Sequence, residues 1–332
     1  MDLVTGATGI VGTHLLLELL RDGRTVRALR RGSSDTGIVA RVFKHYGAAH
    51  LENRIEWIEG DLLDAVALAD AMDGAEHVYH AAALVSFDPR RADALHAVNV
   101  QGTANAVNAA LEAGVKRLCH VSSTASIGAA PPGVMRDESM AFTDGRNSSD
   151  YARSKHLAEL EVHRGIAEGL DAVIVNPSVI IGPGLPGRSS MTLIERLRKG
   201  TRWYTSGSNA FVDARDVAAC MRKLMDQGFP GERYLLVGEN ASYKRLFELA
   251  AEGFGQAPPA LEAKPWMLAL AWRAERMRSL LTGSSPLVTR ATVSSALSTR
   301  AYSNAKVTAV LGCQFRPLEE SVANTVSFAE AG

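Results

Sequence analysis

The chain has 332 residues, enough for one large α/β unit or two modest domains with a buried core. Lysine plus arginine and aspartate plus glutamate number 36 each, so the formal net charge is zero. No charged tract indicates a nucleic-acid partner or a disordered tail. The most apolar late stretch, at 265–273, has about half the length that a bilayer span needs.

The N-terminus and the cysteines favour a cytoplasmic protein. The chain begins with a strand and a glycine loop, without the basic segment and apolar run of a signal peptide. The cysteines lie far apart in the sequence and lack metal or redox spacing, which fits a reducing compartment: Cys119, Cys220 and Cys313. The histidines also lack metal spacing and are interpreted as structural: His14, His77, His80 and His120. We therefore expect a cytoplasmic protein with no metal, no membrane partner and no nucleic-acid partner.

In chain order, short β-branched runs alternate with helical patterns. The predicted strands cover 2–4, 25–29, 55–60, 77–83, 115–123 and 170–177, with a late strand at 233–238. The predicted helices cover 10–21, 36–46, 64–72, 90–113 and 149–168. This alternation predicts an α/β fold with a doubly wound parallel sheet and right-handed crossovers. After Pro177 the rhythm changes, and from about residue 240 onward the pattern is helical with loops.

Three glycines follow the first predicted strand and open the first predicted helix. In "VTGATGIVGTH" they are Gly6, Gly9 and Gly12. A glycine at such a turn lets backbone N–H groups approach a pyrophosphate at the positive end of the helix. The spacing is G-x-x-G-x-x-G rather than the commoner G-x-G-x-x-G, but its place in a βαβ series predicts a dinucleotide site.

The end of the second strand bears on which dinucleotide binds. It reads "VRALRRGSSD", with Arg30 and Arg31 where an NAD site commonly has an acid. Guanidinium groups match the geometry of a 2′-phosphate, so we expect NADP, with NAD as the alternative. Both arginines could instead be solvated loop charges.

A tyrosine and a lysine four positions apart, Tyr151 and Lys155, lie in the helical stretch "SSDYARSKHLAE". They share one face of the helix. A phenol has an ordinary pKa of about 10, and a nearby cation favours its ionised form. The pair could be a tuned acid/base, but the same spacing is frequent on solvated helices.

Seven motifs in order carry a family resemblance: "TGATGIVG", "EGDLLD", "HAAALV", "NVQGTAN", "HVSSTASIG", "YARSK" and "NPSVIIGPG". Together they resemble an extended (atypical) short-chain dehydrogenase/reductase of the NAD-dependent epimerase/dehydratase family. The resemblance covers essentially the whole chain. It implies a Rossmann domain, at 1–176 and 210–239, and a smaller, mostly helical and mostly C-terminal substrate-binding domain, at 177–209 and 240–332.

The resemblance also implies residue roles. Tyr151 would exchange a proton with the substrate, its pKa lowered by Lys155 and the oxidised nicotinamide, while hydride moves to or from the cofactor. Ser123, with Ser122 as the runner-up, would polarise the same oxygen, and Asn99 lies in a helix that usually faces the site. The implied cofactor-binding residues are Gly6, Thr8, Gly9, Ile10, Val11, Gly12, Arg30, Arg31, Asp61, Leu62, Ala81, Ala82, Ala83, Ser122, Tyr151, Lys155, Pro177 and Val179.

Departures from the family's patterns narrow the chemistry. Thr124 and Ala125 follow Ser123 where sugar dehydratases of this family have an acidic pair, and Asn209-Ala210 stands where nucleotide-sugar epimerases commonly have Arg-Asp. The second strand and the C-terminal portion resemble the dihydroflavonol reductase and 3β-hydroxysteroid dehydrogenase branch. Four apolar residues could line a pocket or could be ordinary helix core: Trp266, Met267, Leu270 and Trp272.

The resemblance implies an NADP(H)-dependent enzyme that interconverts a ketone and a secondary alcohol on a moderately apolar small molecule. The alternatives are a nucleotide-sugar epimerase with bound NAD and a non-enzymatic cofactor-binding sensor. Sensors of this family tend to lose the tyrosine or the lysine, and both are present here. Helices near 95–113 and 149–165 often pair across a two-fold axis in this family, so we expect a homodimer.

Overall fold

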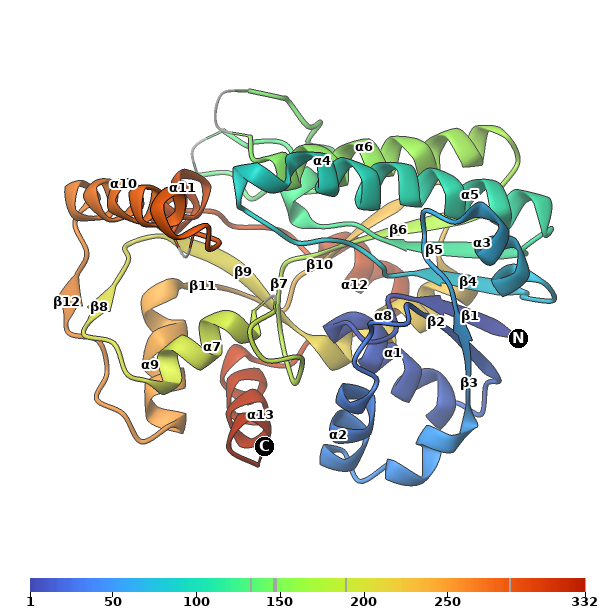
Figure 1. The fold of residues 1–332 in the computed structure, drawn as a ribbon, viewed down its shortest axis with the longest axis horizontal. Coiled ribbons are helices and arrows are strands. Elements are labelled where there is room, and N and C mark those ends of the chain that lie inside the picture. The colour runs from blue at the N-terminus through green and yellow to red at the C-terminus, as the bar shows by residue number, and fades with distance from the viewer. Residues whose placement is uncertain (132, 146–147, 189, 287, 332) are drawn as a thin grey trace.

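A seven-stranded parallel sheet forms the centre of the computed structural model, which describes residues 1–131, 133–145, 148–188, 190–286 and 288–331. Its spatial order is β10-β6-β5-β4-β1-β2-β3 (Figure 1). The strands are β1 (Asp2–Thr5), β2 (Val26–Arg30), β3 (Ile55–Glu59), β4 (His77–His80), β5 (Arg117–Val121), β6 (Ala172–Pro177) and β10 (Arg233–Leu236). The predicted doubly wound sheet is confirmed, including its late strand.

Helices cover both faces of this sheet, because successive strand residues point to opposite sides. Leu3 and Val4, for example, lie in different hydrophobic cores. One core contains side chains of α1 (Ile10–Arg21), α2 (Gly37–His45), α8 (Ala214–Gln227) and α12 (Ala305–Leu311). The other contains side chains of α3 (Ala65–Met72), α5 (Gly102–Glu112) and α6 (Asp150–Ala167), and α5 and α6 lie side by side along one edge of the molecule (Figure 1).

Short helical turns complete this half of the molecule. They are η1 (Ala49–Arg54), η2 (Pro89–Arg91), α4 (Ala92–Leu95), η3 (His96–Gln101) and η4 (Thr124–Ser126). The predicted helix at 90–113 is therefore not regular, because η3 is a π-helical segment between α4 and α5. The predicted strand at 77–83 ends at His80, because the chain leaves the sheet at Ala81–Ala83.

A second, three-stranded sheet lies beyond the central one and was not predicted. Its order is β11 (Glu239–Ser242), β9 (Ser208–Asp213) and β7 (Val179–Ile181), and β8 (Trp203–Tyr204) pairs with β12 (Leu261–Glu262). The remaining helices are α7 (Met191–Arg198), α9 (Tyr243–Gly253), α10 (Pro265–Thr282), α11 (Arg290–Leu297) and α13 (Leu318–Ala331). The later part of the chain is mostly helical as predicted, with these short strands added.

Candidate active site

The sequence-predicted site residues gather at one edge of the central sheet. The carboxyl ends of parallel strands meet at the same edge, where α/β proteins bind ligands. The Gly6–Gly12 loop follows β1, Ala81–Ala83 follow β4, Ser122 and Ser123 follow β5, and Pro177 ends β6. These four strands are neighbours in the sheet, so the topology brings together segments far apart in the sequence.

The glycine loop is packed too tightly for side chains. Gly6 has a φ of 68°, and a Cβ there would lie 2.6 Å from the backbone N and Cα of Ala82. A Cβ on Gly12 would overlap the carbonyl oxygen of Gly6 and lie 2.8 Å from Cα of Ala7. Gly9 is the N-cap of α1 and has no side chain that could accept a hydrogen bond. The N–H groups of the first helical turn therefore have no side-chain acceptor at the cap. The loop can therefore present backbone donors to an anion at the positive end of α1, beside Thr8, Ile10 and Val11.

The two arginines at the end of β2 are in different environments. Arg30 is held by Glu59 across the neighbouring strand, with Nη2 to Oε2 at 3.7 Å. Arg31 is exposed and its backbone N–H donates to Ser34 Oγ. Asp61, after β3, accepts from the backbone N–H of Leu63, which shapes the turn that carries the buried Leu62. Of the two guanidinium groups, that of Arg31 is the less constrained by ion pairing.

Lys155 is a deeply buried charged group at this edge. Its side chain is 2% exposed and donates from Nζ to the carbonyl oxygen of Val121 at 2.7 Å, at the end of β5. Burial lowers the pKa of Lys155 from 10.5 to about 8, and Glu159 one turn away opposes that shift. Two of its three N–H donors have no acceptor among the described residues, so the ammonium can still bind a ligand.

Tyr151 lies one turn before Lys155 and meets Ser123. Burial raises the pKa of Tyr151, and a hydrogen bond with the Ser123 side chain opposes that increase. The resemblance implied a lowered pKa, but here Lys155 points to Val121 rather than to the phenol, and burial has the larger effect. Ser123 also accepts from the backbone N–H of Ala125 at 3.1 Å, which fixes its position at the start of η4.

Asn99 is buried and fully engaged with the protein. Its Nδ2 donates to the carbonyl oxygen of Leu84 and to Ser154 Oγ, both at 2.9 Å, and its Oδ1 accepts from the N–H of Leu84 at 2.7 Å. These bonds tie the segment after β4 to α6, next to Lys155. The contacts are those of a side chain that positions the backbone rather than one that meets the substrate.

A buried polar network behind Ser123 was missed by the sequence reading. Glu159 is 2% exposed, and its Oε1 accepts from Ser126 Oγ at 2.6 Å and from Asn176 Nδ2 at 2.5 Å. Arg233 on β10 approaches its other oxygen at 3.4 Å. Asn176 Nδ2 also donates to the carbonyl oxygen of Ser123, and Ser126 Oγ lies 2.7 Å from that oxygen. In the sequence, Glu159 lies one turn beyond Lys155 on the same helix face, which was the available signal.

The edge fits a nicotinamide dinucleotide. The chain turns at Pro177 and Val179 on either side of Ser178, whose buried hydroxyl has no hydrogen-bond partner among the described residues. The N–H of Ala82 donates to Thr5 Oγ1, which holds the segment after β4 close to the glycine loop. An uncapped helix start, free lysine donors and an unsatisfied hydroxyl are the groups that a phosphate, a ribose and a carboxamide would satisfy.

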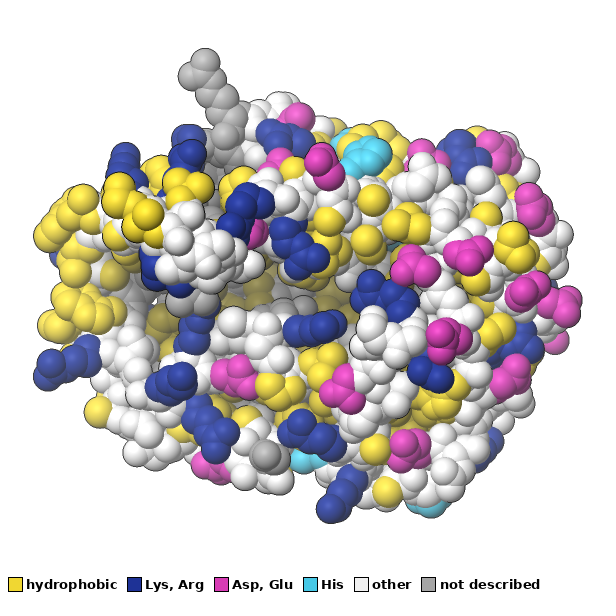
Figure 2. Space-filling model, viewed as in Figure 1, with side chains coloured by type: hydrophobic (Ala, Val, Ile, Leu, Met, Phe, Trp, Pro, Cys, Tyr) yellow, Lys and Arg dark blue, Asp and Glu magenta, His cyan; other side chains and the backbone are white. Residues whose placement is uncertain are grey.

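Two hollows lie outside this edge, and only one is near Tyr151. A hollow of about 280 Å³ has Phe87, Arg153, Arg290 and Ser294 in its wall. The ring of Phe87 meets that of Tyr151 edge-on, with the ring centres 5.6 Å apart. The space-filling view shows the face of the molecule hollowed near its middle, with lysine and arginine side chains around the rim (Figure 2).

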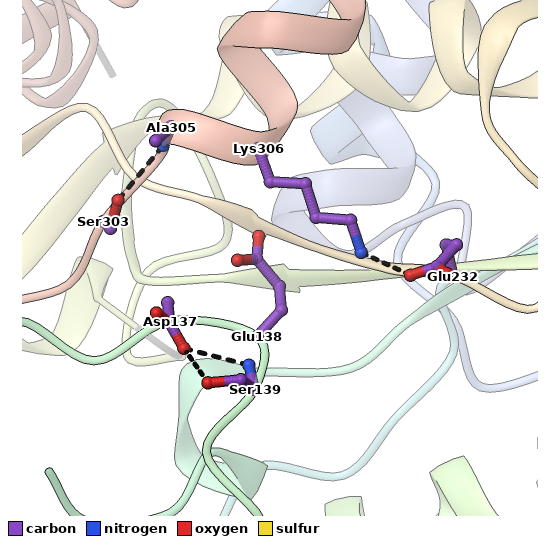
Figure 3. Close-up of a pocket in the computed structure, with 7 residues that line it drawn as sticks. All are labelled: Asp137, Glu138, Ser139, Glu232, Ser303, Ala305 and Lys306. Carbon is purple, nitrogen blue, oxygen red and sulfur yellow. Dashed lines mark hydrogen bonds and ion pairs between the residues drawn. The ribbon is translucent and has the colours of Figure 1, made fainter.

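The larger hollow, of about 470 Å³, is lined by polar groups that bond to the protein (Figure 3). Lys306 is paired with Glu232 at 2.5 Å, Asp137 accepts from Ser139, and Glu138 accepts from the N–H of Leu235. We assign no chemistry to it.

The predicted structural histidines are not all satisfied, because both ring nitrogens of the buried His120 lack a hydrogen-bond partner among the described residues. His80 bonds Thr5 and Thr103 and stacks on His120, and burial lowers the pKa values of both histidines. The cysteines are free thiols. Within the described ranges, no cluster of three or more histidine, cysteine or acidic side chains could hold a metal ion. No helix in the same ranges has the length and apolar character to cross a bilayer.

Comparison with known proteins decides the family. Residues 3–236 match the model of the NAD dependent epimerase/dehydratase family. The chain belongs to this family. This chain is 35% identical to sterol demethylase protein B of Methylococcus capsulatus, over 80% of this chain and 78% of that protein. It is 32% identical to a putative dihydroflavonol 4-reductase of Synechocystis over 97% and 92%. The crystal structure of gox2253 superposes with a TM-score of 0.82 at 31% identity, covering 100% of this chain and 98% of that one.

The predicted family, fold class and enzyme class are therefore confirmed. The chain is an NAD(P)-dependent oxidoreductase of the extended short-chain dehydrogenase/reductase type.

Proposed function

We propose that this enzyme uses NADP(H) to interconvert a ketone and a secondary alcohol on a moderately apolar small molecule. The placement of Tyr151 and Ser123 beside the buried Lys155 at the carboxyl end of β5 carries the proposal. Tyr151 supplies a proton donor, Ser123 a hydrogen-bond donor and Lys155 a cation, all near the carboxyl end of β5. The likeness to a putative dihydroflavonol 4-reductase over nearly the whole chain supports the same reaction class.

The protein's own groups have separate tasks in this reaction. When bound, the cofactor supplies or accepts the hydride. In the direction of reduction, the Tyr151 hydroxyl gives its proton to the carbonyl oxygen, and the Ser123 hydroxyl donates a hydrogen bond to that oxygen. Lys155, which has free donors, stabilises the phenolate left on Tyr151. Asn99 and Glu159 hold these groups in place through the bonds described above.

The segment after β4 supports an apolar substrate, although the hollow beside it is lined mainly by polar and charged side chains, among them Asp150, Arg153 and Arg290. Phe87 and Val85 are 41% and 44% exposed on the segment after β4, and the Phe87 ring touches Tyr151. An apolar body can lie against these side chains while its carbonyl meets Tyr151 and Ser123. The 2′-phosphate of NADP would meet Arg31, the exposed guanidinium at the end of β2.

The family's reaction classes can be separated in one assay. The purified enzyme is mixed with NADPH and a panel of apolar ketones, dihydroflavonols and nucleotide sugars, and loss of reduced nicotinamide is followed by absorbance. We expect oxidation of NADPH with an apolar ketone. Isomerisation of a nucleotide sugar with no net change in the cofactor would replace the proposal with the epimerase reaction. Binding of cofactor with no turnover across the panel would favour a sensor.

We also propose a homodimer built on α5 and α6. These helices pack together on one edge, and α6 leaves Leu157 and Leu160 37% and 48% exposed. Two such faces would form a four-helix interface. Light scattering at micromolar concentration should give twice the chain mass, and a monomer mass would reject the proposal.

A further inference from the structure

Helix α10 is almost unburied, although its first half, at 265–273, is the most apolar stretch of the late part of the sequence. Of its 18 residues only Ser279 is buried. The helix lies at one end of the molecule, beside α11 and away from the central sheet (Figure 1). Packing against the rest of the protein therefore buries little of the apolar surface of α10. The exposed apolar side chains need another explanation.

The exposed apolar residues form a single stripe. At 100° per residue, they fall within about 100° of the helix surface, an arc that also contains the exposed Arg273. They are Trp266, Leu270, Met277, Leu280 and Leu281, and each is between 59% and 82% exposed. The opposite side carries Leu268, Trp272 and Ser279, which are less exposed, and Ser279 donates to the carbonyl oxygen of Ser284. The helix is apolar on both sides, and the protein covers only one of them.

Neighbouring residues extend the stripe into a patch. Trp203 on β8 and Leu261 on β12 are 43% and 45% exposed, and β12 leads directly to α10. The space-filling view shows hydrophobic side chains gathered at this end of the molecule with lysines and arginines among them (Figure 2). We call the five stripe residues together with Trp203 and Leu261 the α10 patch.

Basic side chains accompany the patch. The helix carries three arginines and one glutamate. Arg273 folds over the ring of Trp272, with its guanidinium 4.7 Å from the ring centre, and Arg278 pairs with Glu275. No described group pairs with Arg276, which borders the stripe. The helix therefore has a net positive charge next to its apolar face.

This combination fits a lipid surface better than a second copy of the chain. An interfacial helix has an apolar face with tryptophan and leucine, a basic border, and too little length or hydropathy to span. In a symmetric contact, the arginines of two α10 helices would face each other, and the repulsion would oppose association. Anionic headgroups would instead meet Arg276 with opposite charge, whereas Lys264 is already paired with Glu262 at 3.0 Å.

The patch is also joined to the hollow beside Tyr151. Arg90, after the Phe87 segment, donates to the carbonyl oxygen of Ser284 at 2.9 Å, just beyond the end of α10. Helix α11 packs on α10 and supplies Arg290 and Ser294 to the wall of that hollow. A surface bound by α10 would therefore lie near the entrance through which an apolar substrate reaches Tyr151.

We propose that the α10 patch docks this protein on the surface of an anionic lipid bilayer, with the helix axis in the plane of the membrane. The stripe enters the boundary between headgroups and acyl chains, and Arg276 lies at the phosphates. The docking does not depend on the reaction proposed above. It revises the sequence-based expectation of no membrane partner, which considered only spanning length.

Vesicle binding tests the docking directly. The full chain is sedimented with vesicles of phosphatidylglycerol and phosphatidylcholine, and with vesicles of phosphatidylcholine alone. We expect binding to the anionic vesicles, weaker binding to the neutral ones, and a blue shift of tryptophan fluorescence on binding. The double variant Leu280→Ser/Leu281→Ser should bind at least about tenfold more weakly, because two buried leucines are lost. Arg276→Glu should weaken binding to anionic vesicles alone.

The control is Val66→Ser on α3, a 72% exposed apolar residue far from α10 in the sequence, which should bind as the wild type does. Cofactor affinity in solution should be unchanged in every variant, which verifies the fold. Wild-type protein that stays in the supernatant with anionic vesicles overturns the proposal. So does a double variant that binds equally well, or one whose mass by light scattering falls relative to wild type, since the patch would then be an interface between copies.

Discussion

The carboxyl edge of the central sheet and helix α10 use apolar and small residues in opposite ways. At the edge, Gly6 and Gly12 allow backbone segments to touch, and Lys155 is held inside at 2% exposure. On α10, Trp266 and Leu281 are 65% and 82% exposed. The edge is organised by the protein itself, before any ligand binds. The patch has no such organisation and depends on something outside the chain.

This contrast teaches where substitutions should act. A change at the edge disturbs groups that are already in contact, so it should alter catalysis, cofactor binding or stability. A change on the patch removes nothing that the folded chain uses internally, so it should alter only association with a surface.

Tyr151→Phe should produce the largest loss. The variant keeps the ring that meets Phe87 but removes the hydroxyl that meets Ser123. General acid–base catalysis contributes roughly 10² to 10⁴ in rate, so kcat should fall by about that factor while cofactor affinity is retained. Steady-state rates with any substrate found in the panel measure this. Ser123→Ala should lose less, because the proton route remains, and near-wild-type turnover by Tyr151→Phe would exclude the phenol as proton donor.

Lys155 should make stability rise with pH. Burial gives it a pKa of about 8 in the folded chain against an ordinary value of 10.5. Between these values the unfolded chain holds more protons, so the free energy of unfolding increases with pH across that window and the penalty is complete below pH 8. At 1.36 kcal/mol per pH unit the full change is about 3 kcal/mol.

The matched variant for this effect is Lys155→Met, which keeps the length of the side chain without its charge. Thermal unfolding of both proteins without cofactor, from pH 7 to 10, should show the Tm of wild type rising relative to the variant above pH 8. A constant difference across that range would mean that the folded and unfolded lysines titrate alike.

Gly12→Ala should destabilise the protein by about 1–3 kcal/mol, the usual cost of forcing extra atoms into a packed site. Its Cβ would meet backbone atoms of Gly6 and Ala7, which have no room to move. Gly9→Ala is the control in the same loop, since its Cβ would meet only the Gly6 carbonyl oxygen, at 3.2 Å. Denaturant unfolding should rank Gly12→Ala well below Gly9→Ala, and equal stability would show that the loop is not tightly packed.

Most of the residues at this edge could be predicted from the sequence, because the local sequence patterns there agree with one another. Strand, glycine loop and helix follow in order, and β-sheet topology brings the strand ends together without further information. The role of Glu159 could not be predicted, because in the sequence it looks like a solvated helix carboxylate. Only the fold shows that β10 places Arg233 beside it. Strand β11 reads "ENAS", with little β propensity, and forms only because β9 lies opposite it.

The same limit applies to α10. Its apolar residues were interpreted as pocket or core, since sequence alone does not say which side of a helix the rest of the protein covers. The structure corrects this for Trp266 and Leu270, which are exposed, whereas Met267 and Trp272 are half-buried. A helix with apolar residues on both sides has no clear polar face in its pattern.

Arg31→Ala should weaken NADPH binding about tenfold and leave NADH binding unchanged, because only NADPH carries the phosphate that this exposed guanidinium would meet. Arg30→Ala is the comparison, since Glu59 already holds that side chain. Fluorescence titration with both cofactors provides the measurement. Equal or tighter binding of NADH by the wild type would contradict the expected preference for NADP.

Leu281→Ser should have the smallest effect on the isolated protein. At 82% exposure its side chain makes little contact with the fold, so the free energy of unfolding should stay within about 0.5 kcal/mol of wild type, as for ordinary surface substitutions. Leu249→Ser on α9, at 6% exposure, is the buried counterpart and should lose several times more. Denaturant unfolding of both variants compares them directly. A large loss in Leu281→Ser would mean that the patch is covered within the protein or by a second copy, and α10 would then resemble the carboxyl edge after all.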